Sequence, residues 1–153
     1  MIKVIRVTEE WQRAGVHYVR TEGMVRDFNL TLEGEFEADT PQDLYVLALD
    51  ENLPVSTCRL KILDSKEGAG EKVGKIERVA TIPSHRSRGI GAQVIIEAEK
   101  WLGEFGAKKI VINSRKDALK FYERLGYVPD YTKVTGNGLF ECVETEKKYG
   151  KDL

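Results

Sequence analysis

The sequence predicts an α/β fold in which helices flank a mixed, mainly antiparallel central sheet, in the order β-α-β-β-β-α-β-α-β-β. Three observations lead to this prediction. Apolar runs of strand length, such as 44–49 and 72–82, are bounded by turn residues. Two segments, 92–105 and 117–125, carry apolar residues at helical spacing and end at a glycine. Turn chemistry at Asp50-Glu51-Asn52 favours a hairpin, and hence antiparallel pairing, between the strands on either side.

The first half of the chain begins with a strand at 2–7, where apolar and polar residues alternate. Thr8 is the expected N-cap of a helix that runs from about Glu9 into the region 19–25. The elements predicted next are an irregular acidic stretch at 28–39, a strand at 44–49, its hairpin partner at 54–63, a polar loop at 64–71 and a strand at 72–82.

The second half contains the longer predicted helix, 92–105, with Gly106 as its C-terminal cap. Its apolar stripe consists of Val94, Ile95, Ala98, Trp101, Leu102 and Phe105. The elements predicted after it are a strand at 109–113, a helix at 117–125 and two last strands at 127–134 and 139–145.

Length and composition indicate one domain, residues 1–153, with a core of its own. The formal net charge of −1 argues against a general nucleic-acid binder. No apolar run approaches the roughly 20 residues of a membrane span, and the N-terminus lacks a signal-peptide pattern, so we expect a cytoplasmic protein without a membrane partner. Cys58 and Cys142 are expected to be free thiols, and no residue cluster has metal-ligand spacing.

The charge is distributed unevenly along the chain. Residues 1–50 carry a net charge of −5 and residues 51–153 a net charge of +4. This division would suit a cationic substrate beside an anionic cofactor, but it would equally arise from two solvated surfaces. The acidic segment Glu33–Asp39 leaves the same two alternatives open: attraction of a cationic amine, or a solvated loop.

The most informative motif is Arg86-Ser87-Arg88-Gly89-Ile90-Gly91, between the predicted strand 72–82 and the predicted helix 92–105. A glycine-containing turn that opens a helix directs backbone N–H groups and the positive end of the helix dipole at one point, which favours phosphate binding. A nucleotide-hydrolysing loop would need G-K-[ST], and Gly91 is followed by Ala92 and Gln93. A dinucleotide-binding loop would need a third glycine where Val94 stands. The pattern R-x-x-G-x-G fits fully.

Two blocks of the sequence resemble the GNAT superfamily of acyl-CoA-dependent N-acetyltransferases. The first block, 77–91, reads ERVATIPSHRSRGIG, and the second, 118–127, reads ALKFYERLGY, similar to the family pattern A-x-x-F-Y-x-x-x-G-[FY]. The resemblance covers essentially the whole chain. The region 19–39 resembles, more weakly, the bacterial ElaA-like branch.

The resemblance implies how acetyl-CoA would bind, as the acyl donor and without a metal. The pyrophosphate of coenzyme A would lie against the backbone of Arg86, Ser87, Arg88, Gly89, Ile90, Gly91 and Ala92. Its pantetheine arm would pair with Val79, Ala80 and Thr81, and Asn113 matches a position whose side chain often bonds the cofactor. The basic residues Arg115, Lys116 and Lys120 are candidates for the 3′-phosphate, with a solvated helix face as the more favoured alternative.

Tyr122 is the main catalytic candidate. Attack of an amine on the thioester expels a thiolate, and a neutral phenol, with an ordinary pKa near 10, can protonate it. The alternative for Tyr122 is a core aromatic beside Phe121. Glu77 and Glu141 are candidate bases for the amine proton, although a backbone carbonyl or solvent can also accept it. The Glu141 region stands where ElaA-like relatives often have a histidine, which leaves their substrate and base in doubt here.

The predicted activity is therefore acetyl transfer from acetyl-CoA to a primary amine, in a ternary complex and by direct attack. The acceptor would be a small molecule or a peptide, and family members often form homodimers. The alternative function is a non-catalytic acyl-CoA-binding or regulatory module of the same fold. The sequence names neither the acceptor nor the acyl-chain preference. His17 is expected to be structural, and His85 to lie on the surface.

Overall fold

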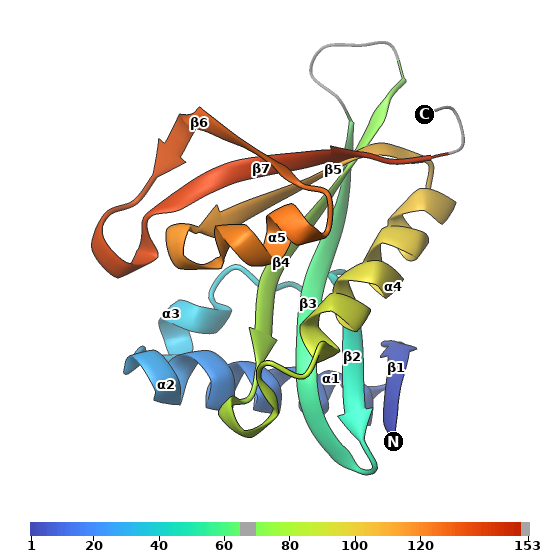
Figure 1. The fold of residues 1–153 in the computed structure, drawn as a ribbon. Coiled ribbons are helices and arrows are strands. Elements are labelled where there is room, and N and C mark those ends of the chain that lie inside the picture. Colours follow the sequence, from blue (N-terminus) through green and yellow to red (C-terminus); the bar gives the residue numbers. More distant parts are fainter. Residues whose placement is uncertain (65–69, 151–153) are drawn as a thin grey trace. The chain divides into compact units, whose positions relative to one another are not determined.

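The computed structural model describes residues 1–64 and 70–150 (Figure 1). The chain divides into two compact units. Unit 1 consists of Met1–Lys61 and Arg78–Ala98, and unit 2 consists of Ile62–Glu77 and Glu99–Leu153. The division falls inside two strands and one helix, so the predicted domain 1–153 stays a prediction.

The order of strands and longer helices along the chain confirms the predicted fold class. The strands are β1 (Ile2–Arg6), β2 (Leu44–Asp50), β3 (Leu53–Asp64), β4 (Lys72–Thr81), β5 (Ala107–Arg115), β6 (Val128–Thr135) and β7 (Cys142–Lys148). The helices are α1 (Glu10–Arg20), η1 (Thr21–Val25), α2 (Arg26–Phe28), α3 (Leu32–Phe36), η2 (Pro83–His85), α4 (Ile90–Glu104), η3 (Lys116–Ala118), α5 (Leu119–Arg124) and η4 (Gly138–Phe140).

The seven strands form a sheet in the order β1-β2-β3-β4-β5-β7-β6. In unit 1, β1 pairs antiparallel with β2, and β2 pairs antiparallel with β3. In unit 2, β7 pairs antiparallel with both β5 and β6. The parallel pairing of β4 with β5 runs from Lys72 opposite Ala107 to Ile76 opposite Ile112. The sheet is therefore mixed and mainly antiparallel, as expected.

Each unit has its own apolar core. In unit 1, α1 lies close to β2, since a Cβ on Gly15 would be 3.0 Å from the Leu47 side chain. In unit 2, Gly74 allows α4 to approach β4, because a Cβ there would lie 2.8 Å from the Leu102 side chain. The predicted stripe of α4 is buried at Val94, Ile95, Ala98 and Leu102, whereas Phe105 at its end is 42% exposed.

Three local predictions are corrected. The N-cap of α1 is Glu9 rather than Thr8, because Glu9 and Gln12 form a reciprocal capping box. The helix then passes into a π-helical turn, η1, which the periodicity did not indicate. The predicted strand 139–145 begins only at Cys142, because η4 occupies Gly138–Phe140. Part of the predicted loop 64–71 lies outside the described residues.

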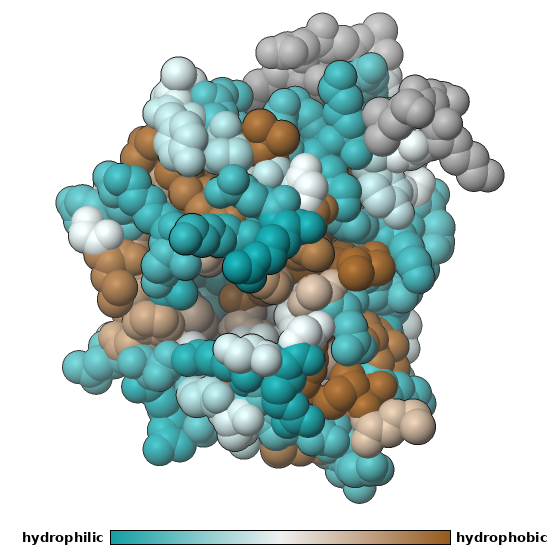
Figure 2. All heavy atoms as spheres, viewed as in Figure 1, coloured by the Kyte–Doolittle hydropathy of each residue, from teal (hydrophilic) through white to brown (hydrophobic). Residues whose placement is uncertain are grey.

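Exposed hydrophobic side chains are spread over several elements, including Trp11 on α1 and Val128 and Tyr131 on β6. On the face seen in Figure 2, hydrophobic residues form small groups among hydrophilic ones. Single exposed apolar side chains are normal for a globular protein. This pattern does not assign a subunit interface, so the homodimer stays a prediction.

The acidic segment 33–39 takes part in a buried ionic cluster in unit 1. Arg20 is fully buried, and its Nε lies 2.9 Å from Oε2 of Glu35. Its two other guanidinium nitrogens donate to Asp39 at 2.6 and 2.9 Å. Arg59 also donates to Asp39, at 2.6 Å, and the Tyr45 hydroxyl donates to the same carboxylate. Glu35 and Asp39 are therefore internal ion-pair partners. Neither of the two interpretations of this segment, attraction of a cationic amine or a solvated loop, describes this role.

This cluster shifts the titration of Asp39. Burial alone would raise the pKa of its carboxyl, but hydrogen bonds from Arg20 and Tyr45 and the charges of Arg20 and Arg59 outweigh burial and lower the pKa to about 2. Because the pKa of Asp39 is lower in the folded than in the unfolded state, its ionised carboxylate contributes to the free energy of unfolding above the ordinary pKa of 3.8. This contribution is lost as the pH falls towards about 2.

We predict that Asp39→Asn lowers the free energy of unfolding by about 2–4 kcal/mol at pH 7, because the guanidinium groups of Arg20 and Arg59 both lose the negative charge of Asp39. Urea unfolding at a series of pH values measures this change. The difference from wild type should narrow between about pH 4 and pH 2, where protonation of Asp39 weakens the same ion pairs. Glu37→Gln, at an exposed carboxylate, is the control and should change stability by less than about 0.5 kcal/mol. A pH-independent difference would contradict this account.

Candidate active site

The predicted phosphate-binding loop lies in unit 1, between the end of β4 and the start of α4. After β4, the Ile82 amide donates to Val55 O at 2.9 Å, and Pro83 opens the short helix η2. The loop then turns through two residues with left-handed backbone, Ser87 (φ 63°) and Gly89 (φ 76°). A Cβ on Gly89 would meet nothing within 4 Å, so its backbone angle, rather than crowding, favours glycine there.

The loop leaves a series of backbone amides at the N-terminus of α4, a helix of 15 residues. The bond from Gln93 N to Gly89 O, at 3.3 Å, is the first that closes a helical turn. The amides of residues 90–92 precede it and therefore have no acceptor within the helix. In the described part of the chain, no backbone acceptor is assigned to the amides of 87–89 either. This combination of exposed loop, open amides and helix dipole is suited to an anion.

The Arg86 side chain is committed to unit 1. Its Nε donates to Thr81 O at 3.0 Å, one terminal nitrogen donates to Gly23 O at 3.1 Å, and the other to Asp27 Oδ2 at 2.8 Å. Gly23 lies in η1, and a Cβ on it would come within 3.0 Å of Thr81 O. Arg86 therefore joins the end of β4 to the η1–α2 segment. Arg88, the second arginine of the loop, is exposed.

The expectation that His85 lies on the surface is wrong. His85 is only 9% exposed, and its Nε2 is hydrogen-bonded to Asp50 Oδ2 at 2.8 Å. Its Nδ1 lies 2.8 Å from the Ser84 hydroxyl. The Nε2 bond thus anchors the start of the loop to the end of β2, while Nδ1 is paired with the neighbouring Ser84. His17 packs edge-on against Phe36, with ring centroids 5.0 Å apart, which agrees with a structural role.

The segment predicted to bind pantetheine, Val79–Thr81, follows the last β4–β5 pair, Ile76 with Ile112. On the β3 side, the Ser56 hydroxyl donates to Ala80 O at 3.1 Å and lies 2.8 Å from the Thr81 hydroxyl. Beyond Ile76, β4 thus has no assigned β5 partner in the described chain, while contacts to β3 continue. An open strand edge of this kind can accept an extended ligand arm.

Tyr122 lies in unit 2, on the short helix α5. Its side chain is 7% exposed and packs edge-on against Phe121 and Tyr127, at centroid distances of 5.0 and 6.1 Å. Tyr127 is held in turn by a bond from its hydroxyl to Glu99 Oε2 at 2.7 Å. These contacts fix the Tyr122 ring in a mostly apolar setting. They are compatible with both its predicted roles, the proton donor and the core aromatic.

The two candidate bases are also in unit 2. Glu77, near the end of the paired part of β4, has a side chain 20% exposed, and its Oε2 lies 3.5 Å from Lys75 Nζ. Glu141 follows η4 rather than lying in a strand. Its carboxylate is 2.6 Å from Lys116 Nζ, and its backbone oxygen accepts from the Lys116 amide at 3.0 Å. This ion pair engages one of the two carboxylate oxygens of Glu141.

The remaining cofactor candidates lie at the end of β5 and just after it, in unit 2. Asn113 is exposed and donates weakly to the Thr135 hydroxyl at 3.5 Å. Arg115 Nε lies 3.5 Å from Asp117 Oδ1, so both Arg115 and Lys116 have acidic neighbours. Lys120 is exposed on α5. These contacts favour the interpretation of Arg115 and Lys116 as surface ion pairs.

Sequence reasoning missed Arg78, Gly23 and Asp27. Arg78 adopts φ 51° inside β4, a conformation uncommon for a residue with a side chain, and nothing in the pattern of β4 signals it. Gly23 was a weak signal, since a glycine inside a predicted helix often marks close backbone approach. Asp27 required knowledge of the tertiary contact with Arg86.

Comparison with known proteins identifies the family. The model of the acetyltransferase (GNAT) family matches residues 5–127. The chain belongs to the GNAT family.

Individual relatives agree with this assignment. The uncharacterized N-acetyltransferase YjcF of Bacillus subtilis is 29% identical over 126 residues, which cover 82% of this chain and 85% of YjcF. The structure of a proposed N-acetyltransferase from Lactobacillus plantarum aligns with a TM-score of 0.83 and 27% identity over 96% of this chain and 97% of that one. Escherichia coli ElaA shares the fold, with a TM-score of 0.75 and 17% identity over 97% of this chain and all of ElaA.

The described residues contain neither a membrane-spanning helix nor a metal-binding cluster. None of the helices in 1–64 and 70–150 has the length and apolar character needed to cross a membrane. Within the same residues, no group of three or more His, Cys, Asp or Glu side chains is arranged to hold a metal ion.

Cys58 and Cys142 are both free, and burial raises the pKa of the Cys58 thiol to about 12.

The contacts of the two loop arginines lead to a prediction. Arg86→Gln should lower the free energy of unfolding by about 1–2 kcal/mol, because three hydrogen bonds, one of them to a carboxylate, are lost. Arg88→Gln should change it by less than about 0.5 kcal/mol. Chemical denaturation of both variants without ligand makes the comparison. Equal stability of the two variants would show that the Arg86 contacts are not formed in solution.

Proposed function

We propose that this protein transfers an acetyl group from acetyl-CoA to a primary amine by direct attack within a ternary complex. The observation that carries the proposal is the series of open amides at the start of α4, preceded by the left-handed turn at Ser87 and Gly89. Membership of the GNAT family supports acyl transfer from acetyl-CoA to an amine in general. The residue roles and the acceptor are our inference.

In this proposal the amides of Ser87 to Ala92 bind the pyrophosphate of coenzyme A, and the Arg88 guanidinium is available as an added charge. Arg86 contributes its backbone, while its side chain positions the loop through Thr81, Gly23 and Asp27. The pantetheine arm pairs with Val79–Thr81, where β4 has left its pairing with β5. Asn113 is a further candidate contact.

The chemistry follows from the thioester. The amine nitrogen forms a bond to the acetyl carbonyl carbon, and the C–S bond breaks with its electron pair on sulfur. The Tyr122 phenol gives its proton to the departing thiolate, and solvent restores that proton. The attacking nitrogen loses a proton to Glu77, Glu141, a backbone carbonyl or water. The products are an N-acetylated amine and coenzyme A.

We predict that Tyr122→Phe reduces kcat roughly a hundredfold, the order expected for loss of a general acid, while acetyl-CoA binds within about twofold of wild type. Amine-dependent release of free thiol gives kcat, and calorimetry gives the dissociation constant of acetyl-CoA. Phe121→Leu is the control for disturbance of the aromatic packing. Turnover by Tyr122→Phe equal to wild type would overturn the proton-donor role.

The same assay separates the enzyme from a non-catalytic acyl-CoA-binding module. Stabilisation by acetyl-CoA together with amine-dependent thiol release supports the transferase. Stabilisation without thiol release across a broad amine panel would support the binding module. Absence of stabilisation by either acetyl-CoA or coenzyme A would contradict both functions, because a ligand at 100 times its dissociation constant adds about 2.7 kcal/mol.

A further inference from the structure

Arg78 is placed unusually within unit 1. It is the residue immediately before Val79–Thr81, and its backbone is left-handed, with φ 51°. Such conformations are unfavourable for residues with side chains and are retained where the surrounding structure enforces them, often at ligand sites. Every second residue of this part of β4 is buried, at Gly74, Ile76 and Ala80. Arg78 belongs to the same series by position but is exposed, so it interrupts the alternation.

The Arg78 guanidinium has capacity for a ligand. Its side chain is 37% exposed, and its assigned ionic contact is with Glu35 Oε1 at 3.7 Å. That distance exceeds hydrogen-bond range, so the contact is electrostatic. The planar fork of N–H groups suits a carboxylate or phosphate, which it can bind through two parallel hydrogen bonds.

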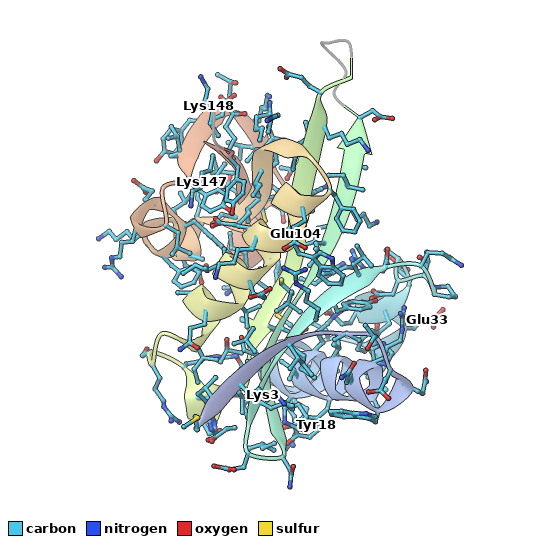
Figure 3. All side chains as sticks on the ribbon, turned by 90° about the vertical axis from the view of Figure 1, so that its right-hand side faces the viewer. Lys3, Tyr18, Glu33, Glu104, Lys147 and Lys148 are labelled. Carbon is cyan, nitrogen blue, oxygen red and sulfur yellow. The ribbon has the colours of Figure 1, made fainter. Side chains whose placement is uncertain are left out.

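The two carboxylates of the buried cluster are held by other groups. Glu35 is 3% exposed and accepts from Arg20 through Oε2, and both oxygens of Asp39 accept from guanidinium groups. Glu33, which also lies on α3 and is labelled in Figure 3, is exposed to solvent. Arg20 and Arg59 are buried, whereas the side chain of Arg78 is 37% exposed, so Arg78 is the one of these three arginines that a ligand from solvent can reach.

We propose that Arg78 binds an anionic group, a carboxylate or a phosphate, on the amine acceptor, so that the substrate class is a primary amine that also carries a negative charge. This inference rests on the proposed function, since it places the acceptor beside the strand segment that would hold the pantetheine arm. A polycationic amine is disfavoured at this position. The alternative role of Arg78 is purely structural, as a distant counter-charge for Glu35.

The test uses two pairs of amines that differ by one anionic group: O-phosphoethanolamine with ethanolamine, and glycine with glycinamide. Wild-type protein should show a kcat/KM at least about tenfold higher for the anionic member of a pair, the order expected for a charge-assisted hydrogen bond. In Arg78→Gln that ratio should fall to about one, and Arg78→Lys should give an intermediate value. Arg26→Gln, at an exposed arginine paired with Glu22, is the control and should keep the wild-type ratio.

A second measurement does not depend on turnover. Calorimetry of protein saturated with coenzyme A should detect inorganic phosphate binding in wild type and Arg26→Gln, weakened at least about tenfold in Arg78→Gln. Equal phosphate binding by Arg78→Gln, or a wild-type preference for ethanolamine and glycinamide, which lack the anionic group, overturns the Arg78 proposal. A different result would overturn the proposed function itself: acetyl-CoA would neither stabilise the protein nor release thiol with any amine. Unfolding midpoints of the variants verify that each is folded.

Discussion

The side-chain contacts of Arg86 hold the candidate cofactor loop in place. One guanidinium bonds the last carbonyl of β4, a carbonyl of η1 and the carboxylate of Asp27. The side chain of Arg86 thereby holds the backbone of the loop residues that follow it. In our proposal the loop binds its ligand through its amides and Arg88, which agrees with the way glycine-containing turns before helices bind phosphate. His85 supports the same arrangement from the other direction through Asp50.

Charge in unit 1 is organised around the same segment. Arg20 is fully buried and is neutralised by Glu35 and Asp39. Burial raises the pKa of the Tyr45 hydroxyl, and its hydrogen bond to Asp39 raises that pKa further. A buried ion pair contributes little net stability, but loss of one partner is costly. The acids that the composition suggested for attracting a cation are thus divided between internal pairs and exposed surface. The guanidinium of Arg78 precedes the proposed pantetheine segment in unit 1, so our proposal favours an acceptor amine that carries an anionic group over a polycationic one.

Periodicity predicted every strand and the two longer helices, because the alternation at 2–7 and the apolar stripe at 94–102 record burial directly. It failed where short-range hydrogen bonds decide the structure: the capping box at Glu9 and the helical turn at Gly138–Phe140. The motif 86–91 located the loop correctly at a strand–helix junction. The roles of its side chains were not predictable, because Asp50, Gly23 and Asp27, which bond His85 and Arg86, lie 35 to 63 residues away in sequence. The left-handed backbone of Arg78 likewise has no signal in local sequence.

The central claim is that the amides of residues 87–92 bind the pyrophosphate of coenzyme A. The most direct measurement is a titration of ¹⁵N-labelled protein with coenzyme A, followed by the chemical shifts of backbone amides. We predict that the amides of Ser87 to Ala92 are among the most strongly shifted, since N–H groups that donate hydrogen bonds to a phosphate change their hydrogen bonding. Binding of coenzyme A that leaves these six amides unshifted would contradict it.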